Sequence, residues 1–253
     1  MHRMRKAFAG RRKVLSGMRY TGESMMIRKQ IGAYTVVSRL GGGRYGVCYL
    51  AKDSAGRQVV LKRFRRRMWK KNQADNYHEA VILSGLSHKA VPRLLGVINQ
   101  RCGYFFVLEY KSGQTLKALL CKKHKRFSAE DVYRIGSQLF KILQYLENRS
   151  VVHGDISISN IVDDGQNIAL LDFGLARYSG GGRTWQIDGA CTADVILYLL
   201  YSDYHGRGDG VWYEELDISS AQKQCLKRLF DAENGYEHAE EAAAAFEAAF
   251  HIK

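Results

Sequence analysis

The residues from Val152 to Gly174 constrain the fold of this chain more than any other stretch. Two acidic residues, Asp155 and Asp172, and the amide residue Asn160 lie in polar segments separated by short apolar runs. The apolar runs meet at Asp164-Gly165, a dipeptide that favours a β-hairpin, and a hairpin would bring Asp172 back beside Asn160. Asp155 could accept the proton of an attacking hydroxyl, and carboxylate and amide oxygens are ligands suited to Mg²⁺. The spacing therefore predicts a phosphoryl-transfer site built around a metal ion.

The spacing H-x-D-x-x-x-x-N, followed by D-F-G twelve residues after the Asn, resembles the catalytic and metal-binding loops of the protein kinase family. The resemblance implies that Asp155 is the catalytic base and that Asn160 and Asp172 hold Mg²⁺. Lys62 ends the strand-like run V-V-L-K, and Glu79 lies in the helical stretch that follows. They are similar to the kinase lysine that contacts the ATP phosphates and to the glutamate that orients it. A lysine on an apolar strand also requires a partner, because an unpaired buried charge is costly.

Three glycines, Gly41, Gly43 and Gly46, satisfy the pattern G-x-G-x-x-G between two strand-like runs. This position resembles the kinase flap whose backbone N–H groups cover the ATP phosphates, whereas a dinucleotide-binding fold places the pattern between a strand and a helix. Glycine suits such a flap because its backbone can approach an anion closely. Alone, the pattern would describe a simple loop equally well, and the position of Lys62 decides in favour of the flap.

The adenine pocket is expected from the register of these motifs. The run G-Y-F-F-V-L-E-Y resembles the fifth kinase strand and the hinge, with Leu108 as gatekeeper and the backbone from Glu109 to Lys111 facing the adenine edge. Cys48, Val60 and Val162 would form the apolar surfaces around the base, since a free thiol behaves as a small hydrophobe. Ordinary core packing would explain each of these apolar residues nearly as well.

The resemblance covers about residues 31–202 and implies an α+β fold, bilobal and protein-kinase-like, with a β-rich small lobe and a helical, truncated large lobe. We expect a basic N-terminal arm over 1–30, the small lobe over 31–111 and the large lobe over 112–253. Residues 114–149 are helical in pattern, and Ser128 begins a long amphipathic helix within them. Asp188 is expected to begin the central helix of the large lobe and to anchor the catalytic loop.

The chain has 253 residues and a formal net charge of +14, which favours anionic partners such as nucleotide, nucleic acid or acidic protein. The arm over 1–30 has the composition of a solvated basic tail, with a nucleic-acid contact as the alternative. Five cysteines without CxxC spacing indicate free thiols in a reducing cytosol rather than a zinc site. No apolar run is long enough to span a bilayer, so we expect a cytoplasmic protein without a transmembrane segment.

Three features depart from ordinary protein kinases. Gly154 stands where many kinases have an arginine that reads a phosphorylated activation loop, and Ser157 replaces the lysine that steadies the γ-phosphate. Another cation, such as Arg177 or Arg183, could supply the charge missing at Ser157. The segment after D-F-G is short and contains no A-P-E motif, although peptide substrates of typical kinases dock on that part.

Together these residues predict an ATP- and Mg²⁺-dependent phosphotransferase, a small bacterial-type serine/threonine-protein kinase with a protein substrate. Autophosphorylation is expected in the basic arm or at Ser179 or Thr184. Three alternatives stay open. H-G-D with a short segment resembles the kinase-like ATPases of the tRNA threonylcarbamoyl-adenosine machinery, which act in a tRNA-modification complex. The second alternative is a nucleotide-binding pseudokinase that serves as a regulatory scaffold. The third is a small-molecule phosphotransferase, although the compact C-terminus leaves little room for the substrate-binding insertions of such enzymes.

Overall fold

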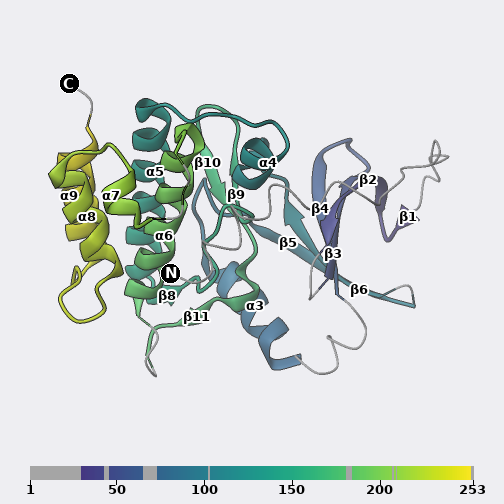
Figure 1. The fold of residues 1–253 in the computed structure, drawn as a ribbon. Coiled ribbons are helices and arrows are strands. Elements are labelled where there is room, and N and C mark those ends of the chain that lie inside the picture. Colours follow the sequence, from purple (N-terminus) through teal and green to yellow (C-terminus); the bar gives the residue numbers. More distant parts are fainter. Residues whose placement is uncertain are drawn as a thin grey trace.

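The computed structural model describes residues 30–42, 46–64, 73–101, 103–180, 184–206, 208 and 210–251, and of residues 73–77 only the backbone. The predicted basic arm, apart from Gln30, lies outside this part of the chain. The described residues form a β-rich part followed by a mainly helical part (Figure 1). This arrangement confirms the predicted α+β, bilobal class.

The small lobe is a six-stranded antiparallel sheet in the order β1-β2-β3-β4-β6-β5. Its strands are β1 (Gln30–Ile31), β2 (Tyr34–Gly42), β3 (Gly46–Lys52), β4 (Gln58–Phe64), β5 (Leu94–Gln100) and β6 (Gly103–Glu109). One face buries a small cluster that includes Val59, Leu61, Phe105 and Val107, because alternate residues of a strand point to the same side. Helix α3 (Gln73–Gly85) joins β4 to β5.

The large lobe lies on the other side of the site and is mostly helical (Figure 1). Its helices are α4 (Leu116–Cys121), α5 (Ala129–Glu147), α6 (Trp185–Leu200), α7 (Trp212–Glu215), α8 (Ser220–Phe230) and α9 (Ala239–Phe250), with single 3₁₀ turns η2 (Phe173–Leu175) and η3 (Tyr201–Asp203). Its short strands are β7 (Gln114–Thr115), β8 (Val151–Val152), β9 (Ile161–Asp163), β10 (Ile168–Leu170) and β11 (Arg177–Tyr178).

Helix α5 forms where the sequence predicts an amphipathic helix. The side chain of Ser128 accepts a hydrogen bond from the backbone N–H of Asp131, which caps the first turn. The predicted apolar stripe is fully buried against the large-lobe core: Val132, Ile135, Leu139, Ile142, Leu143 and Leu146. On the same helix, Arg134 holds Asp163 of β9 with two hydrogen bonds of 3.0 and 2.9 Å. The helix therefore supports the hairpin that carries the site.

The hairpin predicted at Asp164-Gly165 is present. Strands β9 and β10 pair antiparallel, and the backbone N–H of Asp164 donates to the carbonyl of Asn167 to close the turn. Two further strand pairs, β7 with β9 and β8 with β11, are not predicted from the sequence. The first corrects the helical pattern assigned to 114–149, because Gln114 and Thr115 form a strand before α4 begins. Two-residue strands carry too little periodicity to be recognised in a sequence.

The contact between α5 and α9 leaves no room for a side chain at Gly136. A Cβ atom at this position would lie 2.2 Å from Cζ of the buried Phe246 ring. We expect Gly136→Ala to lower the free energy of unfolding by about 1–3 kcal/mol, because overpacking forces the ring or a helix to move. Urea unfolding measures this loss. Gly85→Ala is the control, since its Cβ would meet no atom within 4 Å, and an equal loss in both variants would contradict the packing argument.

Within the described residues, no helix combines the length and apolar character needed to cross a membrane. Cys48, Cys121, Cys191 and Cys225 are free thiols, in agreement with the prediction, and no group of His, Cys, Asp or Glu in the described ranges could hold a metal ion through three of these residues. The predicted Mg²⁺ site is of a different kind, because it uses one carboxylate and one amide together with substrate oxygens.

Candidate active site

An ion-pair network joins the two lobes at Lys62 of β4. Its Nζ lies 2.6 Å from Oε1 of Glu79, on α3, and 2.6 Å from Oδ1 of Asp172, which follows β10. The side chains of Lys62 and Glu79 are 7% and 2% exposed, whereas that of Asp172 is 47% exposed. Asp172 therefore remains accessible while its two partners are enclosed by protein.

Burial and pairing act in opposite directions on this network. Burial lowers the pKa of Lys62, but the charges of Glu79 and Asp172 outweigh it, so that the pKa of the amine is raised above its ordinary value. Burial raises the pKa of Asp172, but the charge and hydrogen bond of Lys62 outweigh it and hold the pKa below its usual range. At Glu79 burial prevails, and the pKa is raised. The accessible carboxylate of Asp172 is consequently ionised at neutral pH.

Asp172 has a left-handed backbone, with φ 63° and ψ 75°, immediately before the turn η2. Residues other than glycine seldom adopt this conformation, and such strain of about 1–3 kcal/mol is found mostly at functional sites. The residue before it, Leu171, donates its backbone N–H to the carbonyl of Asn160 at 2.7 Å. The hairpin thus brings the segments of the two predicted metal ligands side by side, as the sequence spacing suggests.

Asn160 also fixes Asp155. Its amide Nδ2 donates to the backbone carbonyl and to Oδ2 of Asp155, at 2.9 Å in both cases. Because both bonds use the amide nitrogen, they leave the amide oxygen of Asn160 available as a ligand. Burial raises the pKa of Asp155 against the effect of the Asn160 hydrogen bond, and the charge of Asp172 adds to the rise. The carboxylate of Asp155 is therefore more basic than that of an exposed aspartate.

His153 connects the segment of Asp155 to the segment that precedes Asp172. Its Nδ1 accepts the backbone N–H of Asp155 at 3.2 Å, so its proton lies on Nε2, which donates to the carbonyl of Leu171 at 3.1 Å. The ring packs edge-on against Phe173, with centroids 4.7 Å apart. Burial lowers the pKa of His153 to about 4, which keeps the ring neutral in this tautomer. Leu83 is buried in the same core as Phe173, and the partly buried Leu94 packs against that core.

Comparison with known proteins decides the family. The family model described as "Protein kinase domain" matches residues 34–193, a range that contains Lys62, Glu79, Asp155, Asn160 and Asp172. The chain belongs to the protein kinase family. It is accordingly a kinase, a phosphotransferase of the type that the sequence motifs predict.

Similar proteins agree with this assignment. "Probable serine/threonine-protein kinase YbdM" of Bacillus subtilis is 30% identical over 216 residues, which cover 81% of this chain and 84% of that protein. "CTD kinase subunit alpha" of Schizosaccharomyces pombe is 32% identical over 155 residues, 60% of this chain and 26% of that protein. "Serine/threonine-protein kinase MAK" of Homo sapiens is 29% identical over 146 residues, 57% of this chain and 23% of that protein. The kinase thus spans most of the bacterial relative but only about a quarter of the two eukaryotic ones.

In this kinase the catalytic loop is anchored to α6 through Asp188. Its Oδ2 accepts the backbone N–H of His153 at 2.6 Å, and its Oδ1 accepts that of Gly154 at 2.8 Å. The predicted register of this helix is therefore correct, although α6 begins earlier, at Trp185. Burial raises the pKa of Asp188 to about 6, with the two amide hydrogen bonds opposing the rise.

The raised pKa of Asp188 predicts a specific pH dependence of stability. Between about pH 4 and about pH 6 the folded protein binds more protons at this group than the unfolded protein, so the contribution of Asp188 to stability falls as pH rises. The free energy of unfolding of the wild type, minus that of Asp188→Asn, is expected to fall on the order of 3 kcal/mol over this range. Urea unfolding at several pH values measures the difference. A flat difference for Asp188→Asn would contradict the assignment.

The predicted nucleotide-binding residues lie on the strands that face the site. Cys48 of β3 pairs with Gly41 of β2 and with Lys62 of β4, and burial raises the pKa of the Cys48 thiol to about 11, so it remains an uncharged group. Val60 pairs with Leu108 across β4 and β6.

In the large lobe, Val162 is buried in β9.

In the small lobe, the backbone N–H of Glu109 donates to the carbonyl of Arg93, and the carboxylate of Glu109 pairs with Lys111 at 2.9 Å. Gly46 begins β3, and a Cβ there would lie 2.3 Å from the carbonyl oxygen of Arg63. Gly43 and Arg183 lie outside the described residues.

Two residues near Asp155, Lys117 and Tyr198, belong to none of the sequence motifs. Lys117 of α4 and Tyr198 of α6 line one cavity together with Asp155 and Ser157. In the sequence each of them is an ordinary position on a helix. Only the proximity of α4 and α6 to the catalytic loop distinguishes them.

Proposed function

We propose that this protein is an ATP- and Mg²⁺-dependent serine/threonine-protein kinase. The observation that carries the proposal is the position of the Lys62 amine, 2.6 Å from both Glu79 and Asp172. An ammonium ion between a buried carboxylate and an accessible one is oriented toward the space where a triphosphate would lie. Catalysis of phosphoryl transfer depends mainly on such positioning and charge neutralisation.

The donor set of the site fits Mg²⁺. Asp172 offers an accessible carboxylate and Asn160 an amide oxygen, both hard oxygen ligands, and Mg²⁺ completes its coordination with water and phosphate oxygens. When bound, the ion would neutralise charge on the phosphates. The proposed nucleotide contacts are the flap glycines Gly41, Gly43 and Gly46, the apolar residues Cys48, Val60, Leu108 and Val162, and the backbone of Glu109 and Lys111. The backbone N–H of Glu109 already donates to the carbonyl of Arg93, so it is not available to the adenine. The other backbone polar groups from Glu109 to Lys111 would make the adenine contacts.

Asp155 is the proposed catalytic base. Held by Asn160, its carboxylate orients the acceptor hydroxyl and takes its proton. A bond forms between the hydroxyl oxygen and the γ-phosphorus, while the bond from that phosphorus to the β–γ bridging oxygen breaks and ADP leaves. The raised pKa of Asp155 suits a group that must gain a proton during the reaction.

The test is transfer of labelled γ-phosphate with Mg-ATP, followed by acid hydrolysis and separation of the phosphoamino acids. Label in phosphoserine or phosphothreonine, on the kinase itself or on an added protein, supports the proposal. Label only in phosphotyrosine, or ADP formed without any phosphoprotein, would overturn it. Mass spectrometry of the kinase would at the same time test the autophosphorylation predicted for the arm, Ser179 and Thr184.

A kinase-like ATPase is the second candidate, because Ser157 leaves the catalytic loop without the lysine of ordinary kinases and the connection from Asp172 to α6 is short. ADP production that requires tRNA or a partner, with no phosphoprotein, would favour it. A catalytically inactive scaffold is less consistent with the geometry, since Lys62, Asp155 and Asp172 are all held in hydrogen-bonded positions.

A further inference from the structure

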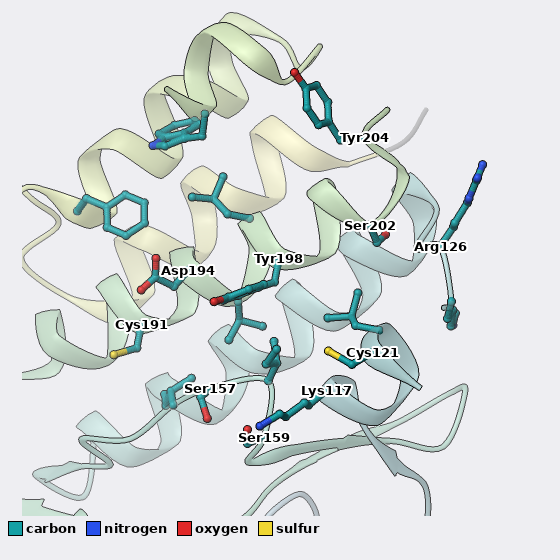
Figure 2. A pocket seen from close by; sticks show the side chains of 18 of the residues that line it. Lys117, Cys121, Arg126, Ser157, Ser159, Cys191, Asp194, Tyr198, Ser202 and Tyr204 are labelled. Carbon is teal, nitrogen blue, oxygen red and sulfur yellow. The ribbon is translucent and has the colours of Figure 1, made fainter. Parts of the chain in front are cut away.

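A large pocket opens directly beside the catalytic loop. Its volume is about 1360 Å³, and Asp155 and Ser157 line one end of it. We call it the α6 pocket, because α6 forms its floor with Cys191, Asp194 and Tyr198, while α4 and α8 contribute the walls. Figure 2 shows Asp194 and Tyr198 on α6, with Ser157 and Lys117 on the other side of the pocket and the Lys117 amine beside Ser159. The volume far exceeds what a single serine or threonine side chain needs.

The pocket exists because little chain is available to cover α6. Residues 173–184 are all that connect Asp172 to the first turn of this helix. Part of that connection is used elsewhere, since Arg177 and Tyr178 form β11 and pair with β8. Among the residues that the structure describes, none covers the face of α6 next to Asp155, which is available to the molecule that presents the acceptor hydroxyl.

The charge of the pocket is predominantly positive. Four permanently cationic side chains line it, and only two carboxylates do so: Lys117, Lys125, Arg126 and Lys227 against Asp155 and Asp194.

Two of the four cations form no ion pair with a carboxylate among the described residues. Lys125 pairs with Asp131 at 3.1 Å and Arg126 with Asp203 at 3.2 Å. Within the part of the chain that the structure describes, Lys117 and Lys227 form no ion pair, and both are exposed. The Nζ of Lys227 lies 3.9 Å from the centroid of the Tyr213 ring, a cation–π contact that does not neutralise its positive charge.

Lys117 is fixed next to the catalytic loop. Its backbone N–H donates to the carbonyl of Ile158 at 2.8 Å, three residues after Asp155. Lys227 reaches the same pocket from α8. An acceptor bound at Asp155 would therefore pass Lys117 near the reacting hydroxyl and Lys227 farther along the pocket. Tyr198 and Trp212 provide apolar surface in the same lining.

We infer that the α6 pocket binds an acidic segment of the acceptor protein, in which glutamate or aspartate side chains flank the serine or threonine that is phosphorylated. This inference rests on the proposed function and names its substrate class. Lys117 and Lys227 act as specificity residues: opposite charge across an interface favours the matching partner and disfavours a basic one. The pocket has room for more than one side chain, and its positive charge suits carboxylates.

The experiment uses three short peptides of equal length, each with one central serine flanked by alternating alanine and a variable residue. The variable residue is glutamate, glutamine or lysine. We expect kcat/KM for phosphoryl transfer to follow the order glutamate, glutamine, lysine, with the first at least roughly tenfold above the second. The preference should weaken as salt is raised from low to high concentration, because exposed charges are screened.

Charge-reversal variants locate the preference. Lys117→Glu and Lys227→Glu are each expected to lower the ratio of kcat/KM for the glutamate peptide over the glutamine peptide by roughly three- to tenfold. Lys123→Glu is the matched control: it makes the same charge change close to Lys117, at an exposed residue that does not line the pocket, and should leave the ratio unchanged. A ratio is used because a general loss of fold or activity would lower both terms equally.

The outcomes separate the inference from the proposed function. The inference would be overturned if the glutamine or lysine peptide were phosphorylated as well as the glutamate peptide or better. It would also be overturned if Lys117→Glu, Lys227→Glu and Lys123→Glu changed the kcat/KM ratio equally. Either result would leave the kinase proposal intact. Fluorescence anisotropy with labelled peptides covers the case in which none is phosphorylated. Preferential binding of the glutamate peptide, lost in Lys117→Glu, would then support the pocket while the function fails. Displacement of that peptide by single-stranded RNA, but not by unlabelled peptide, would overturn the inference.

Discussion

Replacement of Asp155 by asparagine is expected to lower kcat for phosphoryl transfer by roughly 10²–10⁴-fold. Asparagine has the same shape and can still accept the hydrogen bond that Asn160 donates at 2.9 Å, but it cannot take a proton from the acceptor. The affinity for Mg-ATP should change little, because Asp155 belongs to the acceptor side of the site. Steady-state transfer of labelled phosphate gives kcat, and a fluorescent nucleotide analogue gives the affinity.

The exposed Asp217→Asn variant is the control for this result, since it removes the same charge at a residue that does not line the pocket beside Asp155. The pH profile adds a second check. Activity of the wild type should fall at acid pH as Asp155 is protonated, and because its pKa is raised by burial, the fall should begin at a higher pH than for an exposed aspartate. Near-wild-type kcat in Asp155→Asn would show that another group, or none, accepts the proton.

Lys62→Met is expected to lower the free energy of unfolding by about 3–5 kcal/mol at neutral pH, in addition to abolishing transfer. The variant leaves the buried Glu79 carboxylate without its cation, and an unpaired buried charge is strongly destabilising. Glu79 can escape this cost only by taking up a proton. The deficit relative to the wild type should therefore be smallest at acid pH and grow as pH rises. Urea unfolding across pH measures both effects.

The double variant Lys62→Met/Glu79→Leu separates pairing from packing. Replacing both members of a buried pair by apolar residues of similar size is often neutral or stabilising, so the double variant should be more stable than Lys62→Met alone while remaining inactive. That result would mean that the pair is kept for the reaction and not for the fold. A double variant less stable than Lys62→Met would contradict this interpretation.

The residues of the proposed active site could be identified in the sequence because each lies in a run of fixed spacing. Asp155, Asn160 and Asp172 are confined to one hairpin and its two ends, so that a local pattern fixes their geometry. Lys62 and Glu79 come from distant elements, yet each sits in a recognisable strand or helix pattern. The helix α5 was predictable for the same reason, since a capping residue and a regular apolar stripe coincide at Ser128.

The α6 pocket could not be predicted in this way. Its lining comes from α4, the catalytic loop, α6 and α8, and no sequence pattern records that Lys117 and Lys227 share one cavity. On its own helix Lys227 is an exposed charge like its neighbours. The left-handed backbone of Asp172 is likewise a product of tertiary packing, because aspartate by itself prefers other conformations. Charge and strain at these positions are consequences of the folded chain as a whole.

The two hydrogen bonds from the loop to Asp188 have a consequence for how such an enzyme is governed. They couple the arrangement of the reacting groups to the folding of the large lobe itself, so the machinery is assembled as soon as the chain has folded. Because position 154 is glycine, the loop offers no arginine there to receive an activating phosphate, so control by phosphorylation through this position is not expected.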